Sequence, residues 1–141
     1  SVERNTRNAV LISFEVTEEI RKKFKFEAGQ YLTLETKIGE NKVRRSYSIC
    51  SPPSDGLQVG IKEIPKGVFS THANRVLKAG ETIMVGTPKG EFKYVKSLKE
   101  QRLVAFAAGS GITPIMSIIK TALNDNKNTS FSRQRYCEND F

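Results

Sequence analysis

The residues best suited to binding a cofactor lie in the segment Arg-Arg-Ser-Tyr-Ser at positions 44–48. On a strand, alternation places Arg45 and Tyr47 on one face and Ser46 and Ser48 on the other. Arginine offers a planar fork of donors to a phosphate, and tyrosine offers a flat ring that can stack on a heteroaromatic ring. The segment therefore indicates a site for a phosphorylated aromatic cofactor. An edge strand with an exposed arginine and a half-buried tyrosine gives the same pattern.

A second candidate site begins at Gly67, where a glycine lets the backbone come close to a ligand. The amides that follow, above all those of Phe69 and Ser70, open a predicted helix. Unpaired N–H groups and the positive end of the helix dipole suit a diphosphate at such a position. Ser70 and Thr71 add hydroxyl donors. A plain helix cap would show the same residues, so this segment alone leaves both interpretations open.

A third candidate is the loop Gly-Ser-Gly-Ile-Thr-Pro at positions 109–114. It follows an apolar run and precedes a predicted helix, which is the context of a dinucleotide-binding loop. Pro114 stands where that fingerprint has its third glycine. We expect Thr113 to cap the helix and Pro114 to take the first helical position, because the missing N–H of proline needs no partner there.

These segments need a framework of short strands to position them. Alternation and turn residues predict strands over residues 8–16, 30–37, 43–50, 57–64 and 82–86, and a sixth short strand beginning at Phe92. Leu57, Val59 and Ile61 share one face of the fourth strand. With one short helix over residues 68–77, this pattern favours a small antiparallel barrel or sandwich.

The pattern changes after residues 97–101, where we expect a domain boundary. The apolar run at 103–108 suits a strand buried on both faces of a parallel sheet, and a helix is predicted from Thr113 through Leu123. No convincing second buried strand follows. We therefore expect two units: residues 1–98 as the cofactor-binding barrel and residues 99–141 as an incomplete start of a nucleotide-binding domain.

Composition narrows the function. The formal net charge is +8, which favours anionic partners such as nucleotide phosphates, an acidic electron carrier or nucleic acid. Aromatic residues do not alternate with the basic ones, which argues against single-stranded nucleic acid. Cys50 and Cys137 are two thiols, fewer than the four that an iron–sulfur cluster needs, so we expect no cluster and no metal. Two thiols, no secretory signal and no apolar run of membrane-spanning length favour the cytoplasm.

The three segments together resemble the ferredoxin–NADP reductase superfamily, and most of all the reductase components of bacterial oxygenases, the phenylacetyl-CoA oxygenase reductases among them. The family motif R-x-Y-S stands at 45–48, its pyrophosphate segment G-x-x-S-T at 67–71, and its nicotinamide loop G-x-G-x-x-P at 109–114. Their order and spacing match from about residue 8 to residue 123. The resemblance implies a mainly β fold: a six-stranded antiparallel Greek-key flavin-binding barrel, followed by the first strand–loop–helix of an α/β nucleotide-binding domain.

The resemblance also implies roles. Arg45 would pair with a flavin phosphate, Tyr47 would stack on the isoalloxazine ring, and Ser48 would bond near flavin N5. Thr113 would lie where the nicotinamide meets the flavin, so Tyr47, Ser48 and Thr113 are the expected catalytic residues. The remaining expected cofactor-binding residues are Ser46, Ile49, Ile61, Lys62, Gly67, Val68, Phe69, Ser70, Thr71, Gly109 and Gly111. The pyrophosphate segment favours FAD over FMN.

The implied activity is hydride transfer from NADH or NADPH to FAD and onward electron transfer to an acceptor protein, such as an oxygenase or a ferredoxin. Two alternatives stay open. One is an FAD-binding fragment that does not turn over nicotinamide on its own, because the second unit is truncated. The other, prompted by the +8 charge and the short strands, is a basic nucleic-acid-binding barrel.

Overall fold

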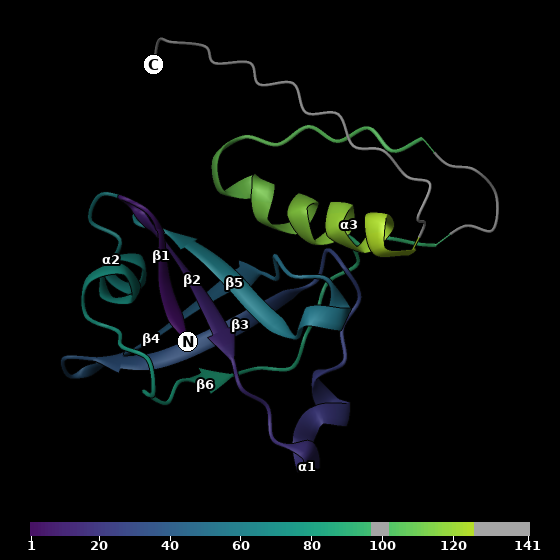
Figure 1. Cartoon of the computed structure of the whole chain (residues 1–141). Helices are drawn as coiled ribbons and strands as arrows, with labels where there is room; N and C mark the ends of the chain where they lie inside the picture. Colours follow the sequence, from purple (N-terminus) through teal and green to yellow (C-terminus); the bar gives the residue numbers. More distant parts are fainter. Residues whose placement is uncertain (97–101, 126–141) are drawn as a thin grey trace, which may run out of the picture.

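The computed structural model describes residues 1–96 and 102–125 of the chain, and it consists of two small antiparallel sheets and a few helices (Figure 1). One sheet has the order β1 (Val2–Thr6), β2 (Ala9–Phe14), β5 (Leu57–Lys62). The other has the order β4 (Asn41–Ser48), β3 (Tyr31–Ile38), β6 (Met84–Val85). The helices are α1 (Glu18–Arg21), α2 (Val68–Arg75) and α3 (Ile112–Asp125). The mainly β antiparallel fold is therefore confirmed.

Alternation along the strands builds the core. β2 and β5 pair antiparallel with Val10 opposite Ile61 and Ile12 opposite Val59, and all four side chains are buried. Paired residues of an antiparallel sheet point to the same face, so two rows of apolar side chains enter the interior together. Leu57, Val59 and Ile61 lie on the buried face, as the sequence predicted.

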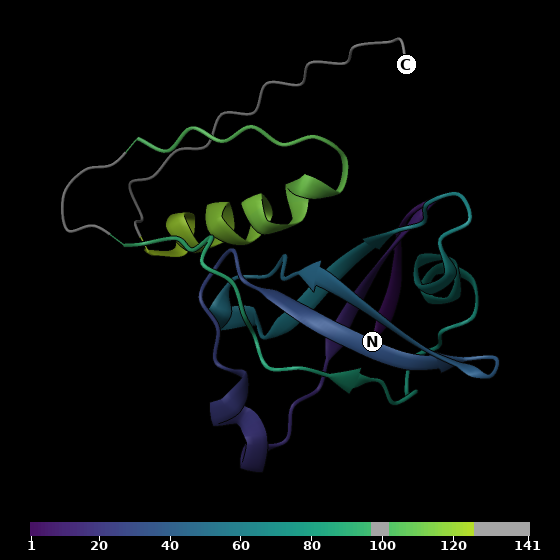
Figure 2. The same cartoon turned by 180° about the vertical axis from the view of Figure 1, so that it is seen from behind.

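The β3–β4 hairpin closes the core from the other side. Leu32 lies opposite Tyr47 and Leu34 lies opposite Arg45, so the two motif residues share the face of two fully buried leucines. Past the end of β4, an isolated bridge between Ile49 and Val59 brings the two sheets together. The strands therefore carry the Arg45–Ser48 segment to the place where β4 and β5 meet (Figure 2).

Two strand predictions are wrong, and one strand was not predicted. The structure has its additional strand, β1, at the start of the chain, and Phe92 lies in exposed coil. β1 escapes prediction because its residues after Val2 are polar and exposed, as an edge strand allows. The expected strand at 103–108 is an exposed coil instead, with the Phe106 side chain 93% exposed. An apolar run becomes a strand only beside a partner strand, and no strand among the described residues pairs with it.

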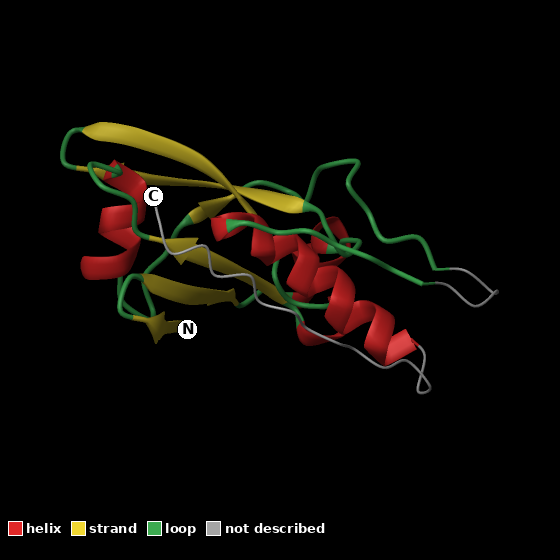
Figure 3. Ribbon diagram, turned by 90° about the horizontal axis from the view of Figure 1, so that it is seen from above, coloured by secondary structure: helices red, strands yellow, loops and turns green. Residues whose placement is uncertain are grey.

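α3 lies across one end of the strands, and the coil 102–108 runs along its other side (Figures 1 and 3). The buried hydroxyl of Ser117 donates to the Ser51 carbonyl at 2.6 Å, and Asn124 Nδ2 donates to Ser54 Oγ at 3.3 Å. These bonds attach the middle and the end of α3 to the loop after β4. Across residues 1–96 and 102–125, none of the helices combines the length and the apolar character needed to cross a membrane.

The start of α3 also differs from expectation. The helix begins at Ile112 after a 3-10 turn at Gly109–Gly111, so Thr113 lies inside the helix and is not its N-cap. The Thr113 hydroxyl donates to the Ser110 carbonyl at 2.9 Å. Thr113 thus tightens the turn that leads into the helix, and Pro114 takes the third helical position, not the first.

Candidate functional site

The Tyr47 ring packs against the Phe69 ring, with centroids 5.5 Å apart and planes tilted by 41°. Tyr47 comes from the Arg-Ser-Tyr-Ser strand and Phe69 from the first turn of α2, so the two strongest motifs of the sequence meet. Phe69 is buried, whereas Tyr47 is half-buried. Burial raises the pKa of the Tyr47 phenol above its usual value, and the nearby Arg45 charge partly opposes that rise. The tyrosine therefore presents a neutral, partly exposed ring beside the helix start.

The other residues of the strand motif point outward. Arg45 is exposed, and Arg45 Nη1 donates to the Arg44 carbonyl at 2.7 Å, which leaves most of its donor fork open to a ligand. The Ser46 hydroxyl lies 3.2 Å from the Thr33 hydroxyl on the opposite face of the strand. Ser48 is half-exposed at the end of β4, opposite Tyr31. An exposed guanidinium beside a half-buried ring fits a phosphorylated aromatic ligand.

α2 begins at Val68, with Gly67 as its N-cap residue. The Thr71 amide donates to the Gly67 carbonyl at 2.9 Å, which closes the first helical turn. The amides of Val68, Phe69 and Ser70 precede that bond, and no acceptor for them is found in the part of the chain that the structure describes. Three free N–H groups at the positive end of an eight-residue helix form an arrangement that can bind phosphate oxygens.

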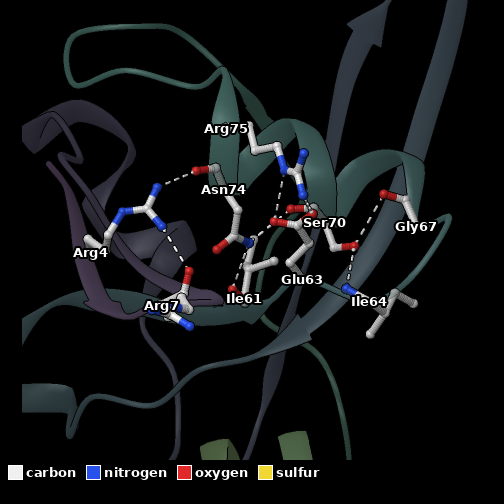
Figure 4. Close-up of polar contacts among 9 residues, drawn as sticks. All are labelled: Arg4, Arg7, Ile61, Glu63, Ile64, Gly67, Ser70, Asn74 and Arg75. Atoms are coloured by element: carbon white, nitrogen blue, oxygen red, sulfur yellow. Dashed lines mark hydrogen bonds and ion pairs between the residues drawn. The ribbon is translucent and has the colours of Figure 1, made fainter.

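The loop before α2 shows why position 67 is a glycine. A Cβ there would lie 2.5 Å from Ile64 Cγ1 and would collide with Ser70 Oγ. Ser70 Oγ accepts from the Ile64 amide and donates to the Gly67 carbonyl, both at 3.3 Å (Figure 4). The Ser70 hydroxyl thus organises the loop, so its backbone amide is the group left for a ligand. Of the remaining motif residues, Val68 is exposed and Thr71 is half-buried.

A cleft of about 500 Å³ lies between the outer face of β2 and β5 and the start of α3. Several expected site residues line it: Ile61, Lys62, Gly109 and Thr113. The side chains of Lys62 and Lys120 contribute positive charge, and Ser110 adds a hydroxyl. The other expected site residues do not line this cleft within the described ranges; they are Arg45–Ser48, Ile49, Gly67–Thr71 and Gly111. The expected residues thus fall into two groups. One lies where β4 meets α2, the other lines the cleft beside α3, and β5 runs between them.

Gly60 of β5 lines this cleft next to the start of α3. A Cβ built on Gly60 would lie 3.1 Å from Thr113 Cγ2 and 3.6 Å from Leu11 Cδ2. α3 therefore approaches β5 as closely as a glycine permits. Gly60 was not predicted as a site residue, although a glycine inside a strand is a known signal of close backbone approach.

Cys50 also lines the cleft, just after the end of β4. It is buried, and burial raises the pKa of its thiol, with the Lys120 charge partly opposing. Its Sγ donates to the Gln58 carbonyl at 3.4 Å, so the thiol acts as a small core residue. Across residues 1–96 and 102–125, no three His, Cys, Asp or Glu side chains gather where they could hold a metal ion.

The geometry defines a class of protein: a mainly β unit in which a tyrosine-bearing strand meets the start of a helix with free amides, and in which a second helix borders a cleft lined by two lysines. Residues 1–94 match the family model of the oxidoreductase FAD-binding domain. The chain belongs to this family of ferredoxin reductase-like FAD-binding domains. The resemblance to the ferredoxin–NADP reductase superfamily is thereby confirmed.

Two relatives come from oxygenase and epoxidase systems. One is a component of the 1,2-phenylacetyl-CoA epoxidase of Escherichia coli (strain K12), which is 39% identical over 133 residues, covering 93% of this chain and 37% of the relative. The ferredoxin reductase component of 3-ketosteroid-9-alpha-monooxygenase from Rhodococcus rhodochrous is 38% identical over 126 residues, covering 87% of this chain and 35% of the relative. The chain thus spans little more than a third of the length of these relatives.

Solved structures have the same fold. The flavohem-like FAD/NAD-binding domain of nitric oxide dioxygenase from Vibrio cholerae superposes with a TM-score of 0.74 at 22% identity, over 91% of this chain and 56% of that one. The Amycolatopsis cytochrome P450 reductase GcoB superposes with a TM-score of 0.73 at 25% identity, over 90% and 38%.

Proposed function

We propose that the chain holds FAD where β4 meets α2, and that it forms the flavin-binding part of an NAD(P)H-dependent reductase. The observation that carries the proposal is the contact between Tyr47 and Phe69, whose ring centroids lie 5.5 Å apart. Through it, a surface for an aromatic ring and a set of free amides for a diphosphate lie side by side. A ligand with both parts, such as FAD, can engage both at once.

Each residue has a defined task in this proposal. Arg45 pairs with a phosphate, the Tyr47 ring supports the isoalloxazine ring, and the amides of Val68, Phe69 and Ser70 bind the diphosphate. Ser48 offers a hydroxyl near the reacting end, and Gly67 and Thr71 line the rest of the site. We assign no contact with the ring or the diphosphate to Ser46, which lies on the other strand face, to the fully buried Ile49 and Ile61, or to Lys62 in the neighbouring cleft. When bound, FAD supplies the chemistry of accepting electrons from reduced nicotinamide and passing them on. The side chains orient the ligand and set its surroundings.

The cleft beside Thr113 is the proposed place of the nicotinamide, with Gly109 and Gly111 in the loop that leads to it. The Lys62 and Lys120 charges suit an anionic dinucleotide. In this division, residues 1–98 form the FAD-binding domain and residues 99–141 contribute to nicotinamide-nucleotide binding. We propose NADH or NADPH as the electron donor.

We further propose that an acceptor protein receives the electrons. Two relatives are named as reductase components of oxygenases or monooxygenases, which supports this class of partner. The net charge of +8 favours an acidic acceptor, since opposite charge raises the encounter rate. The free thiol of Cys50 fits a reducing compartment, and we propose the cytoplasm.

A second candidate function is FAD binding without nicotinamide turnover. The exposed coil at 103–108 favours it, because that run is not paired in a nucleotide-binding sheet in the part of the chain that is described. The barrel would then hold FAD while the donor has no complete site.

The test has two stages. The purified chain is incubated with FAD, passed through a desalting column and scanned for bound flavin. The proposal requires a yellow protein, and a colourless chain that retards oligonucleotides in a gel would favour the nucleic-acid alternative instead. The yellow protein is then mixed with NADH, and separately with NADPH, under nitrogen. Bleaching supports the reductase, whereas a flavin that stays yellow with both supports FAD binding alone.

A further inference from the structure

Asn74 is a buried polar residue in the last turn of α2, with its side chain only 4% exposed. Its Nδ2 donates two hydrogen bonds, to the Ile61 carbonyl at 3.0 Å and to the Ser70 carbonyl at 2.9 Å (Figure 4). Ile61 belongs to β5, and Ser70 lies one turn earlier in the helix. One amide group therefore joins the helix to the strand.

The strand needs this partner because of the sheet topology. β5 pairs with β2 on one edge. On the other edge, within the described residues, it meets the segment just after β4 through the Ile49–Val59 bridge and the bond from the Cys50 amide to the Gln58 carbonyl. The Ile61 carbonyl lies beyond that bridge, so α2 satisfies a group that a neighbouring strand would otherwise satisfy. The amide orientation follows as well: a flipped Asn74 would place its oxygen against two carbonyl oxygens. Oδ1 faces the other way and finds no donor among the described residues.

Apolar packing of Phe69 and Ala73 into the core also holds α2 on the sheets. The other polar contacts of its last turn lie at the surface. Arg75 forms an ion pair with Glu63 at 2.7 Å, and the Arg75 side chain is 67% exposed. Arg4 Nη2 donates to the Asn74 carbonyl at 2.8 Å, and this arginine is exposed too. Exposed pairs of this kind contribute little to rigidity, because solvent screens them. Among these polar contacts of the last turn, the Asn74 amide is the buried one, and it acts on the same helix whose first amides are free.

We infer that Asn74 is a positioning residue for the diphosphate site: it fixes α2 on the end of β5, and so fixes the Val68, Phe69 and Ser70 amides relative to Tyr47. This inference rests on the proposed function. A helix held at one place on the strand presents its amides in a defined position, and a shifted helix presents them poorly. The ring-binding residue Tyr47 lies on β4, where pairing with β3 holds it, so a shift of α2 reaches it only through the Phe69 contact and affects it less.

The inference predicts different effects of an Asn74 substitution on the binding of two ligands, FAD and riboflavin. FAD has the diphosphate, whereas riboflavin has the same isoalloxazine ring and no phosphate. Dissociation constants for both are measured by fluorescence titration for the parent chain, Asn74→Ala and Ile12→Val. Ile12 is a buried residue of β2, so its loss of one methyl group lowers stability without touching the α2–β5 attachment.

For Asn74→Ala we expect FAD affinity to fall about tenfold, as for the loss of an ordinary hydrogen bond, while riboflavin affinity changes by less than about twofold. For Ile12→Val the ratio of the two affinities should equal that of the parent. If the alanine variant does not fold, Asn74→Ser replaces it, because serine keeps one hydrogen-bond donor at shorter reach. Its ratio of FAD to riboflavin affinity should lie between that of the parent and that expected for Asn74→Ala. Equal losses of FAD and riboflavin, or an unchanged ratio, would overturn the inference alone. A parent chain that binds neither flavin would overturn the proposed function, and the inference with it.

Discussion

Tyr47 and Phe69 lie in contact, 5.5 Å between ring centroids, although one ends a strand and the other starts a helix across a long connection. The contact aligns the half-buried phenol with the free amides of α2. Each motif alone has an ordinary structural explanation, as an edge strand or a helix cap. Their contact is the observation on which the proposed shared ligand site rests.

The alkaline stability of the chain should depend on Tyr47. Burial raises the pKa of its phenol, so the folded state favours the neutral form. The stabilisation is complete below the ordinary tyrosine pKa of about 10 and is lost as the pH rises through the higher folded value. Tyr47→Phe cannot ionise. Urea unfolding at about pH 8 and about pH 11 should therefore show a smaller drop for Tyr47→Phe than for the parent. Equal drops would mean that Tyr47 titrates as in the unfolded chain.

Arg45→Ala should weaken FAD binding. A charge-assisted hydrogen bond contributes about 1.5–3 kcal/mol, which corresponds to a loss of roughly tenfold to more than a hundredfold in affinity. Arg44→Ala is the matched control, because Arg44 lies next in sequence but pairs with Glu35 on the other face of the strand. Equilibrium titration with FAD measures both. If Arg44→Ala loses affinity and Arg45→Ala does not, the phosphate role belongs to Arg44.

The Gly60–Thr113 contact predicts an energetic coupling between β5 and α3. Gly60→Ala adds a Cβ 3.1 Å from Thr113 Cγ2, so the start of α3 must shift by a few tenths of an ångström. Overpacking of this kind costs about 1–3 kcal/mol. Thr113→Ser removes the crowding methyl group and keeps the hydroxyl that bonds to Ser110.

A double-mutant cycle by urea unfolding measures the coupling. We expect the serine substitution to recover at least about 0.5 kcal/mol of what Gly60→Ala loses. Strictly additive effects would show that α3 does not pack on Gly60 in solution.

Lys66 should tolerate glycine with a gain in stability. Its φ is 61°, in the left-handed region, which costs a residue with a side chain about 1–2 kcal/mol. Glycine removes that cost but loses more chain entropy on folding, so we expect a net gain of about 0.5–1 kcal/mol in the free energy of unfolding. Lys66→Ala removes the same charge and keeps the Cβ, so it should show no gain. A loss of stability in Lys66→Gly would contradict the left-handed conformation.

Local patterns determined much of this fold. Alternation placed Leu57, Val59 and Ile61 on the buried face, and the glycine at position 67 marked the start of α2. These features depend on residues that are close in the sequence, so they can be predicted from the sequence alone. The family motifs also kept their order, which is why the flavin-binding fold could be predicted.

Features that depend on residues distant in the sequence were not predicted, or were predicted wrongly. The run 103–108 has the composition of a strand, yet strand formation needs a pairing edge that no local pattern specifies. Thr113 looked like an N-cap, but the preceding glycine turn lets the helix start earlier. Asn74 looked like an ordinary polar helix residue, and only its burial against the Ile61 carbonyl gives it a role.

The coil at 103–108 has a practical consequence for every experiment above. The segment 103–108 carries no charged residue and makes few hydrogen bonds to the rest of the described chain. It exposes the apolar side chains of Leu103, Val104 and Phe106 to solvent. At the concentrations used in titrations, two copies can adhere through such a ribbon, because its backbone groups and apolar side chains complement themselves. The substitutions Val104→Lys and Phe106→Lys would make two copies repel each other, and they would leave the Tyr47 ring and the free amides of α2 unchanged.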